Sequence, residues 1–584
     1  MAPSEQGRAG AAQGDDQDTV SGYPHRPRTE RNTGGHVHHS LRGTRRSLRL
    51  VAVAAAVAIV AAACGGGGGT KTTSGGQKGS TTPVAGGSIT YGLDAEHPGG
   101  FCTPTAQLAA AGILENLSFY DTLMVPNEKG DMVPYLAQSV TNSPDYKTWT
   151  IKLRPGIKFH DGAALDSTAL KDNFEALRKG ALFAFVFTNI ADEQIVDPLT
   201  LNVTMKVPWV AFKSYLFSTG RLGIVSPNSL KDPVACANHP VGTGPFMVKE
   251  WIVNDHLTVV RNPNYWRKDS AGRQLPYLDQ ITFRPIIDPD ARLNALRSGQ
   301  LDLMMTDNGD TIFQARQAVN AGSLASVENQ KSAEVGYTML RVDRAPFNDQ
   351  TARQAVAYAA NRDELNTIAN HGVNTLTNTP FAPDVFGYVK EPVQPPIAFD
   401  LNKAKQLVTQ YKASHGGSFD FTIRHTNDPS VIKLAQLVQS QWQAAGMTVH
   451  LVSADQATLI NQALGGNFQA ILWRNHPGAD PDTQYVWWHS NSPVNFGNIK
   501  DAQIDQDFDT ARSSTDTAVR KAAYEDIQRV FDQKLYNLWS WYSLWAFIGK
   551  PTVHGIDGPT LPDGGGKQGL IASVHPIVGL YVSK

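Results

Sequence analysis

Short segments with strand-like alternation are followed by helical segments along most of this chain, beginning near Ser88. Residues 88–93 (SITYGL) alternate polar and apolar side chains, as a half-buried strand does. Residues 166–180 open on helix-capping side chains and end on a glycine, and 431–454 pair an amphipathic helix with a strand. No repeat with a period of 20–50 residues is present. The pattern predicts an α/β fold.

The chain has 584 residues, more than one hydrophobic core supports. Cores stop growing at roughly 250–300 residues, so we expect at least two lobes. The net charge is −1, and 41% of the residues are hydrophobic. This composition is typical of a globular protein, and no basic stripe favours a nucleic-acid partner.

One apolar run, Val51–Ala63, stands near the N-terminus. It is shorter than the roughly 20 residues of a membrane span. It follows a basic stretch, and Cys64 comes directly after it. This order is typical of a secretory signal and resembles a bacterial lipoprotein signal. We expect residues 1–63 to be a leader and Cys64 to carry lipid, with a cleaved plain signal or an uncleaved anchor as alternatives. Paired arginines in TRRSLRL (44–50) leave Sec and twin-arginine export both open.

Residues 64–87 are rich in Gly, Ser and Thr, and predict a flexible tether. Only Cys102 and Cys236 follow it. An even cysteine count in an exported protein favours a Cys102–Cys236 disulfide, and two buried free thiols are the alternative.

No pattern typical of an enzyme is present. The chain lacks a Gly-x-Ser-x-Gly elbow, a His-Glu-x-x-His helix and a Walker loop. The glycines of PVGTGPF (240–246) permit unusual backbone angles, but no Gly-Lys-Ser/Thr follows them to bind phosphate. The His-rich HVHH (36–39) lies in the leader, so we expect neither metal nor cofactor.

Six segments occur in the order and spacing of one known family. They include TWTIKLRPGIKFHDGAALDS, HPVGTGPF and NPNYW, and their ranges are 123–140, 148–177, 239–266, 275–303, 345–365 and 399–408. From Ser88 to about Gly558 the chain resembles the peptide/nickel-type (family 5) extracytoplasmic solute-binding lipoproteins of ABC importers. The resemblance implies a two-lobed, periplasmic-binding-protein-like fold with a hinge. Lobe I would hold 88–335 with an extra subdomain, lobe II 336–544, and 545–584 would return to lobe I.

The resemblance also suggests where the ligand binds. In peptide-binding members the strand corresponding to NFQAILW (467–473) ends with an aromatic residue and then an Asp that pairs with the ligand's ammonium group. Trp473 matches the aromatic, and His476 stands at the Asp position. We therefore expect a ligand with hydroxyl, carboxylate or phosphate groups to suit the candidate contacts. These are Phe101, Trp473, Arg474, Asn475, His476 and Asp480, with aromatic side chains of 537–545 as weaker candidates.

The sequence thus predicts a monomeric, exported protein held by lipid at the outer face of the cell membrane. It would capture a small molecule or peptide and pass it to an ABC permease and ATPase complex. A surface sensor or adhesion lipoprotein with the same fold is the alternative.

Overall fold

The structure is a computed structural model that describes residues 82–475 and 478–583. The leader 1–63, Cys64, most of the predicted tether and His476 lie outside the described residues. Within that part, a seven-stranded, a six-stranded and a four-stranded sheet are present, with two small strand pairs. The fold is α/β and two-lobed.

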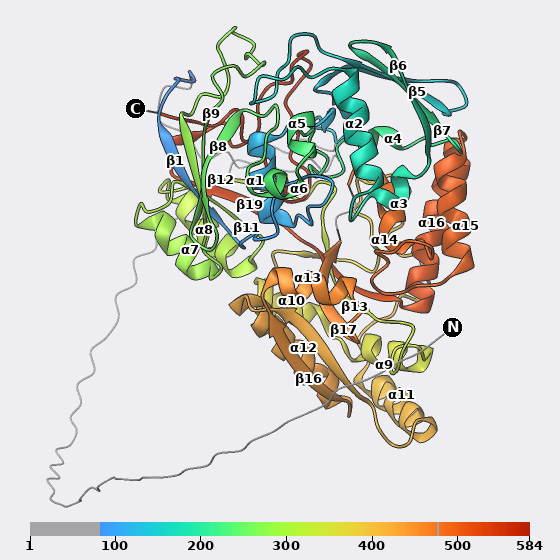
Figure 1. Cartoon of the computed structure of the whole chain (residues 1–584). Coiled ribbons are helices and arrows are strands. Elements are labelled where there is room, and N and C mark those ends of the chain that lie inside the picture. The colour runs from blue at the N-terminus through green and yellow to red at the C-terminus, as the bar shows by residue number, and fades with distance from the viewer. Residues whose placement is uncertain (1–81, 476–477, 584) are drawn as a thin grey trace, which may run out of the picture. The chain divides into compact units, whose positions relative to one another are not determined.

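The first sheet forms the centre of lobe I (Figure 1). Its strand β1 is parallel to both neighbours, β10 and β11, and the remaining pairings are antiparallel. In spatial order the strands are β12 (Ala325–Asn329), β19 (Trp545–Gly549), β11 (Leu303–Thr306), β1 (Ser88–Leu93), β10 (Gln280–Pro285), β9 (His256–Arg261) and β8 (Phe246–Ile252).

The second sheet forms the centre of lobe II. Every residue of its strand β13, VGYTML, is buried, as in a strand that is covered on both faces. Strand β15 is parallel to β16 and β17, so the carboxyl ends of these three strands meet at one edge. In spatial order the strands are β14 (Thr375–Leu376), β18 (Asn537–Tyr542), β13 (Val335–Leu340), β17 (Ala470–Asn475), β15 (Asp420–Thr426) and β16 (Thr448–Ala454).

The chain passes between the two sheets twice. It leaves the first sheet after β12 and enters the second at β13, which begins at Val335. It returns between β18, which ends at Tyr542, and β19, which begins at Trp545. Two adjacent crossings of this kind form the connection about which two lobes can rotate.

A four-stranded sheet forms the extra subdomain, inserted between β1 and β8. Its strands, in spatial order, are β4 (Ala137–Asn142), β5 (Thr148–Leu153), β7 (Thr200–Met205) and β6 (Ile190–Asp197). The small pairs are β2 (Met124–Pro126) with β3 (Met132–Pro134), and β20 (Val553–His554) with β21 (Tyr581–Val582). The sequence TWTIKLRPGIKF (148–159) predicts a strand, a Pro-Gly turn and a second strand at 157–159. The structure has only an isolated bridge there, Lys158–Ala164, because turns at Gly156 and Gly162 leave too few residues to pair.

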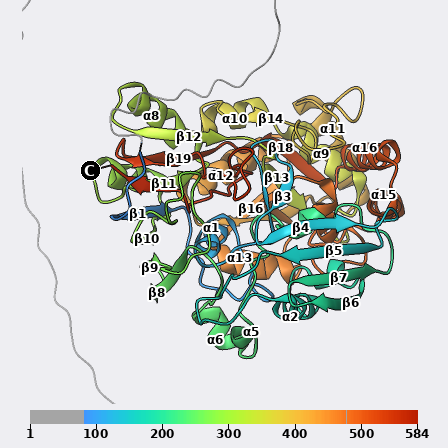
Figure 2. The ribbon, with the colours of Figure 1, turned by 90° about the horizontal axis from the view of Figure 1, so that it is seen from above.

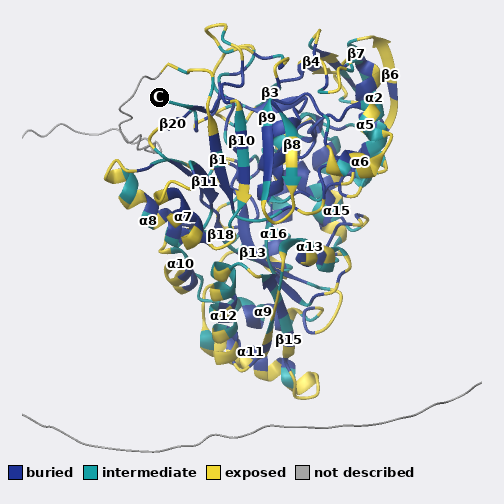
Figure 3. Ribbon diagram, turned by 60° about the vertical axis from the view of Figure 1, so that its left-hand side comes forward, coloured by how far each residue is buried: buried dark blue, intermediate teal, exposed yellow. Residues whose placement is uncertain are grey.

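Aspartates cap most of the longer helices, as the sequence pattern predicts. Asp166, for example, accepts a hydrogen bond from the backbone N–H of Ala169 and begins α2. The outward faces of α11 and α12 are exposed, and the central strands are buried (Figure 3). The helices are α1 (Ala110–Phe119), α2 (Ser167–Arg178), α3 (Ala184–Phe187), α4 (Phe212–Tyr215), α5 (Pro227–Leu230), α6 (Pro233–Asn238), α7 (Pro289–Arg297), α8 (Gly309–Asn320), α9 (Gln350–Ala359), α10 (Arg362–Asn370), α11 (Leu401–Ser414), α12 (Pro429–Ala444), α13 (Gln456–Leu464), η1 (Pro481–Gln484), α14 (Tyr485–Trp488), α15 (Ala502–Ser513) and α16 (Thr517–Lys534).

The core of the subdomain continues into lobe II. One cluster of buried apolar residues runs from the subdomain sheet to α14, α15, α16 and β13, and it is separate from the core around β1. Figures 1 and 2 both place β5 and β7 near α15 and α16. The subdomain therefore touches the opposite lobe as well as its own.

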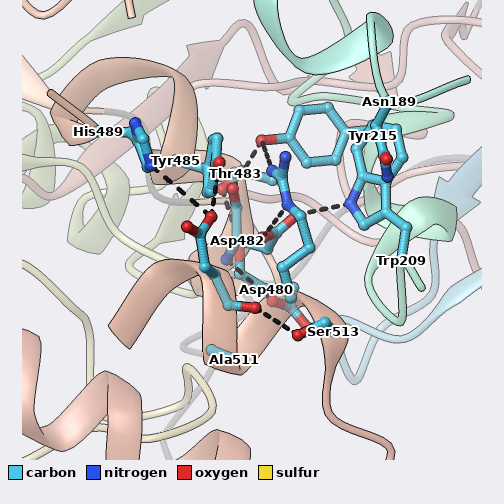
Figure 4. Close-up of polar contacts among 12 residues, drawn as sticks. Asn189, Trp209, Tyr215, Asp480, Asp482, Thr483, Tyr485, His489, Ala511 and Ser513 are labelled. Atoms are coloured by element: carbon cyan, nitrogen blue, oxygen red, sulfur yellow. Dashed lines mark hydrogen bonds and ion pairs between the residues drawn. The ribbon is translucent and has the colours of Figure 1, made fainter. Parts of the chain in front are cut away.

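A buried ion pair lies at this contact (Figure 4). Asp482 and Arg512 of lobe II are 2.9 Å apart, with side chains 0% and 5% exposed. From the subdomain, the Trp209 indole N–H donates to the Asp482 carboxylate at 2.7 Å, and the Tyr215 hydroxyl donates to the Asp482 carbonyl oxygen at 2.6 Å. The Arg512 guanidinium lies 3.5 Å from the centre of the Tyr485 ring. The ion pair thus joins the subdomain to lobe II.

Replacing Asp482 by Asn should leave the Arg512 charge buried without its partner. We expect the variant to lose about 3–5 kcal/mol of stability, the usual cost of breaking a buried pair. Urea unfolding measures the loss. Asp526→Asn is the control, because its pair with Arg529 is exposed and should contribute under about 1 kcal/mol. A loss at Asp482 no larger than the control's would contradict this role.

A buried histidine, His575, contacts Tyr91 and Phe547 of the first sheet. His575 Nε2 lies 2.8 Å from the carbonyl oxygen of Ile556, which can only accept, so Nε2 carries the proton. Nδ1 then accepts from the Tyr91 hydroxyl at 2.8 Å. Burial lowers the pKa of His575 to about 4, against opposing effects of the Ile556 carbonyl and Asp557. The native protein therefore keeps this imidazole neutral.

This histidine should destabilise the fold in mild acid. Below the ordinary histidine pKa of about 6.5, His575 binds a proton in the unfolded chain but stays neutral in the native state. The resulting loss of folding stability is absent above that pH and reaches about 2 kcal/mol at pH 5. His575→Gln, which retains a donor and an acceptor, should lose less stability than wild type between pH 7.5 and pH 5 in urea unfolding. Exposed His450→Gln serves as control, and equal losses in all three proteins would refute the assignment.

Candidate ligand-binding cavity

A cavity of about 510 Å³ lies between the lobes, and both lobes line it. Lobe I contributes residues of the loop after β1 together with Arg221, Arg292 and Asp307. Lobe II contributes residues from β13, β17 and the loops that begin α12 and α13. The volume is within the range of small-molecule sites.

The topology explains why polar groups gather here. Asp94 directly follows β1, and Asp307 directly follows β11, and these two strands are parallel. Asp428 and Asp455 likewise come two residues and one residue after the parallel strands β15 and β16. Because carboxyl ends of parallel strands meet at one edge, each sheet presents its polar loops to the same cavity.

A disulfide holds the lobe I loop. Cys102 and Cys236 are joined, with their Cα atoms 5.1 Å apart, so the loop after β1 is tied to α6. The bridge closes a separation of 134 residues. The Phe101 N–H also donates to the carbonyl oxygen of Ala237 at 2.9 Å. The structure therefore contains the bridge that the cysteine count predicts, and the bridge fixes one wall of the cavity.

Phe101, which we predicted as a ligand contact, lies in the core. Its side chain is 0% exposed and is absent from the cavity lining among the described residues. It packs against His97, Phe119 and Trp251, with ring centres 4.9–5.1 Å away. The disulfide next to it turns the loop inward, so Phe101 belongs to the core. Neighbours on the same loop, Asp94 to Pro98 and Gln107 to Ala110, include the residues that line the cavity.

Trp473 lines the cavity, half-buried, near the end of β17. It packs edge-on against Phe496, with ring centres 5.9 Å apart. Trp487 is also half-buried in the lining and packs against the same Phe496 at 5.7 Å. Together these rings offer apolar faces to the cavity.

Arg474 lines the cavity, but carboxylates already surround its charge. It forms an ion pair with Asp307 of lobe I, and its Nε lies 3.8 Å from Glu334. The guanidinium lies 5.1 Å from the centre of the Trp545 ring. Burial raises the pKa of Asp307, and Arg474 opposes this rise. The pair links the lobes, so Arg474 is not the free cation that we predicted for a ligand carboxylate or phosphate.

Asn475 also lines the cavity, but its amide serves the fold. Its oxygen accepts from the Val335 N–H at 2.8 Å, and its NH₂ group donates to the Pro380 carbonyl at 3.1 Å. His476 cannot be placed, because it is outside the described residues.

Asp480, also predicted as a ligand contact, makes structural contacts. It caps η1 by accepting from the Asp482 N–H at 2.9 Å, and it pairs with Arg520 at 2.9 Å. It is absent from the lining residues that the structure describes. A helix cap and an ion pair use both of its oxygens, so Asp480 has a structural role.

Arg221 is the cation that sequence reasoning missed. It lines the cavity, is 6% exposed, and donates from Nε to the Leu108 carbonyl at 3.1 Å. Burial lowers its pKa to about 10, and more distant Glu334 opposes that effect. Within the described residues no Asp or Glu oxygen lies within the 4.0 Å of an ion pair with it. The surrounding sequence, STGRLGIV, gives no signal of this role.

The other lining charges are more fully engaged. Arg292 donates to the carbonyl oxygens of Ile287 and Leu93 at 3.3 and 3.4 Å, and also to that of Ile286. Burial raises the pKa of Asp94 to about 6, and Arg474 and Arg292 restrain this rise. Asp428 and Asp455 cap α12 and α13.

The glycines of the loop 240–246 have a packing role, and the aromatic segment 537–545 contributes to both the cavity and the cores. Gly242 and Gly244 were expected to permit unusual backbone angles, but neither has a positive φ. A Cβ there would lie 2.1 Å from the Phe119 oxygen and 2.4 Å from the Phe119 carbonyl carbon. These glycines are needed because two backbones approach closely. Of the aromatic segment 537–545, Trp541 lines the cavity, whereas Trp539 and Trp545 belong to the cores.

Within residues 82–475 and 478–583, no helix has the length and apolarity of a membrane span. No group of three or more His, Cys, Asp or Glu side chains there is arranged to hold a metal ion.

Comparison with known proteins agrees with this architecture. The model of bacterial extracellular solute-binding proteins, family 5 (middle), matches residues 131–498. The nickel-binding periplasmic protein of Escherichia coli K12 is 26% identical over 459 residues, which cover 75% of this chain and 86% of that protein. The glutathione-binding protein GsiB of Pectobacterium atrosepticum is 28% identical over 431 residues, 70% of this chain and 80% of that protein.

A solved structure shows the same fold. The periplasmic binding protein DppA of Helicobacter pylori, in complex with the peptide STSA, superposes with a TM-score of 0.75 at 22% identity. The match covers 86% of this chain and 99% of that one. Since the family model spans more than half of the chain, and the two-lobed fold and interlobe cavity agree with it, this protein belongs to the bacterial extracellular solute-binding proteins of family 5.

Proposed function

We propose that this protein is an exported, lipid-anchored receptor that closes its lobes around a small organic solute and presents it to an ABC permease and ATPase. It acts as a monomer and carries out no covalent chemistry. The observation that supports this most directly is the cavity of about 510 Å³ that both lobes line. A site divided between two lobes is formed fully only when they close.

Two sets of contacts to lobe II suit such closure. The Asp307–Arg474 pair joins the end of β11 in lobe I to β17 in lobe II. The bonds from Trp209 and Tyr215 to Asp482 join the subdomain to lobe II. Opening would separate both sets, so a ligand that holds the lobes together favours the arrangement described here.

The family does not fix the ligand, because its members differ in what they bind. One relative is described as nickel-binding and another as glutathione-binding. Aromatic and aliphatic side chains line much of this cavity, which favours an organic solute over a bare metal ion. Of the lining carboxylates, Asp307 is in an ion pair, Asp428 and Asp455 cap helices, and Arg474 and Arg292 act on the charge of Asp94. We therefore propose that ordinary peptides with a free N-terminus are poor ligands.

The N-terminal sequence supports anchoring at the outer face of the membrane. A basic stretch, a short apolar run and Cys64 follow one another, and a Gly-rich segment separates them from the folded residues. A lipid on Cys64 would hold the receptor near the permease, and the tether would let it move.

Filling the cavity should abolish solute capture. Ala109→Trp places an indole in the lining next to α1, so protein purified from its own host should release no small molecule on denaturation. Wild type and Ala518→Trp, whose site is on the exposed start of α16, should both release one, as mass spectrometry can show. Equal circular dichroism spectra establish that the variants fold. Retention of the same solute by Ala109→Trp would place the site elsewhere.

Changing Cys64 to Ala should remove the anchor without affecting the binding domain. We expect the variant to leave the membrane fraction, because a signal and tether without lipid provide no stable attachment. Immunoblots of membrane and soluble fractions after a carbonate wash measure this. Ser74→Ala in the tether is the control and should stay with the membrane. A Cys64→Ala protein as firmly membrane-bound as the control would refute lipidation.

A further inference from the structure

The described aromatic side chains of the cavity all come from one lobe. Among the described residues, every aromatic side chain of the lining belongs to lobe II, and none comes from lobe I. These side chains are Tyr337, Trp473, Trp487, Trp488, Phe496 and Trp541. We call them the aromatic wall. Lobe I instead places Arg221, Arg292, Asp94, Glu96 and Asp307 in the lining.

The three arginines that the structure describes in the cavity differ in how far other groups compensate their charges. The Arg474 charge is compensated by Asp307 and Glu334, and Arg292 donates to three backbone carbonyls. Arg221 donates only from Nε, to one carbonyl, and no carboxylate within the described residues forms an ion pair with it. A buried guanidinium without a counter-ion is unfavourable. An anionic group of the ligand would supply that counter-ion.

The negative groups of the cavity offer no comparable site for a cation. Asp307 is paired, Asp428 and Asp455 cap helices, and Glu96 accepts the Asn254 N–H at 3.0 Å. Asp94 keeps one buried oxygen without a hydrogen bond, but Arg292 and Arg474 both act on its charge. Two arginines act on Asp94, whereas only the more distant Glu334 is a carboxylate noted to act on Arg221 within the described residues, so Arg221 is the less compensated of these two charges.

The aromatic wall suits a flat apolar body. Trp473 and Trp487 are half-buried, so each retains surface toward the cavity. Phe496 packs edge-on behind Trp473, which holds that ring in place. Indole faces stack well on rings, and a guanidinium fork pairs with a carboxylate through two parallel hydrogen bonds.

We infer that the solute is an amphipathic anion whose carboxylate, or a similar group, binds Arg221 of lobe I while its ring or flat apolar body lies on the aromatic wall of lobe II. The inference rests on the proposed function, since it specifies the ligand class of the same cavity. Each half of such a molecule would bind a different lobe. Only a solute that has both halves would then hold the lobes closed.

Calorimetry with matched probes tests both halves. Indole-3-propionate carries ring and carboxylate, indole-3-propionamide lacks the charge, and hexanoate lacks the ring. Wild type should bind the first about 10- to 100-fold more tightly than the amide, the range of a charge-assisted bond, and about 10-fold more tightly than hexanoate. Tighter binding of the amide or of hexanoate would overturn the inference.

Substitutions at Arg221 and Trp473 test which residue binds the carboxylate of the ligand and which binds its ring. Arg221→Gln should abolish the preference for acid over amide, and Arg221→Lys should restore part of it, which separates charge from folding. Trp473→Ala should abolish the preference over hexanoate and leave the acid-to-amide ratio unchanged. An acid-to-amide ratio that Arg221→Gln does not change would overturn the assignment.

The native solute distinguishes this inference from the proposed function. Solute released from wild-type protein should bind an anion exchanger at pH 7 and absorb in the near ultraviolet. A released solute that is neutral or cationic would overturn the amphipathic anion and leave solute capture standing. Release of no solute, together with no binding of any probe, would contradict both.

Discussion

One buried carboxylate ties together the segments on which the two-lobed arrangement depends. Glu334 lies directly before β13, at the first crossing between the sheets, and is 0% exposed. It accepts from the Trp545 indole N–H and from the Ser573 hydroxyl, both at 3.0 Å, and its backbone oxygen accepts from Ser543 at 2.8 Å. The two crossings, the C-terminal segment and the cavity arginine Arg474 thus meet at one side chain. A buried charge is tolerated only with such partners, so the position of Glu334 constrains the connection between the lobes.

Local chemistry made much of the fold predictable. Helices begin where Asp caps precede amphipathic segments, as at Asp166 and Asp428, and the apolar residues AILW begin β17, where the composition predicts a strand. The order of strands in each sheet was not predictable in this way, since nothing local to 545–549 shows that this strand lies between β11 and β12. The family resemblance implied only that 545–584 returns to lobe I, and gave no strand order. The short predicted strand at 157–159 failed because two tight turns compete with it.

The position of the candidate site could be predicted from the sequence better than the roles of its side chains. Trp473, Arg474 and Asn475 do line the cavity, because the end of a strand that is parallel to its neighbour points to a shared edge. What each side chain can offer a ligand depends on partners remote in sequence: Asp307 is 167 residues from Arg474, and Pro380 is 95 residues from Asn475. Arg221 is available because, in the part of the chain that the structure describes, no carboxylate forms an ion pair with it. Availability of this kind is a property of the folded chain, and no motif around a residue reports it.

The place of β19 in the first sheet also constrains how the molecule is assembled. Strand β12 pairs, within the described residues, only with β19, and β11 has β19 on one side. Synthesis delivers residues 545–549 more than two hundred residues after β12. Until then β12 has no neighbour, and one edge of β11 exposes free N–H and C=O groups of the kind that recruit foreign strands. The sheet of lobe I therefore begins with early residues of the chain but is complete only when β19 is added. Until then, the open edge of β11 is the surface that a chaperone would need to cover.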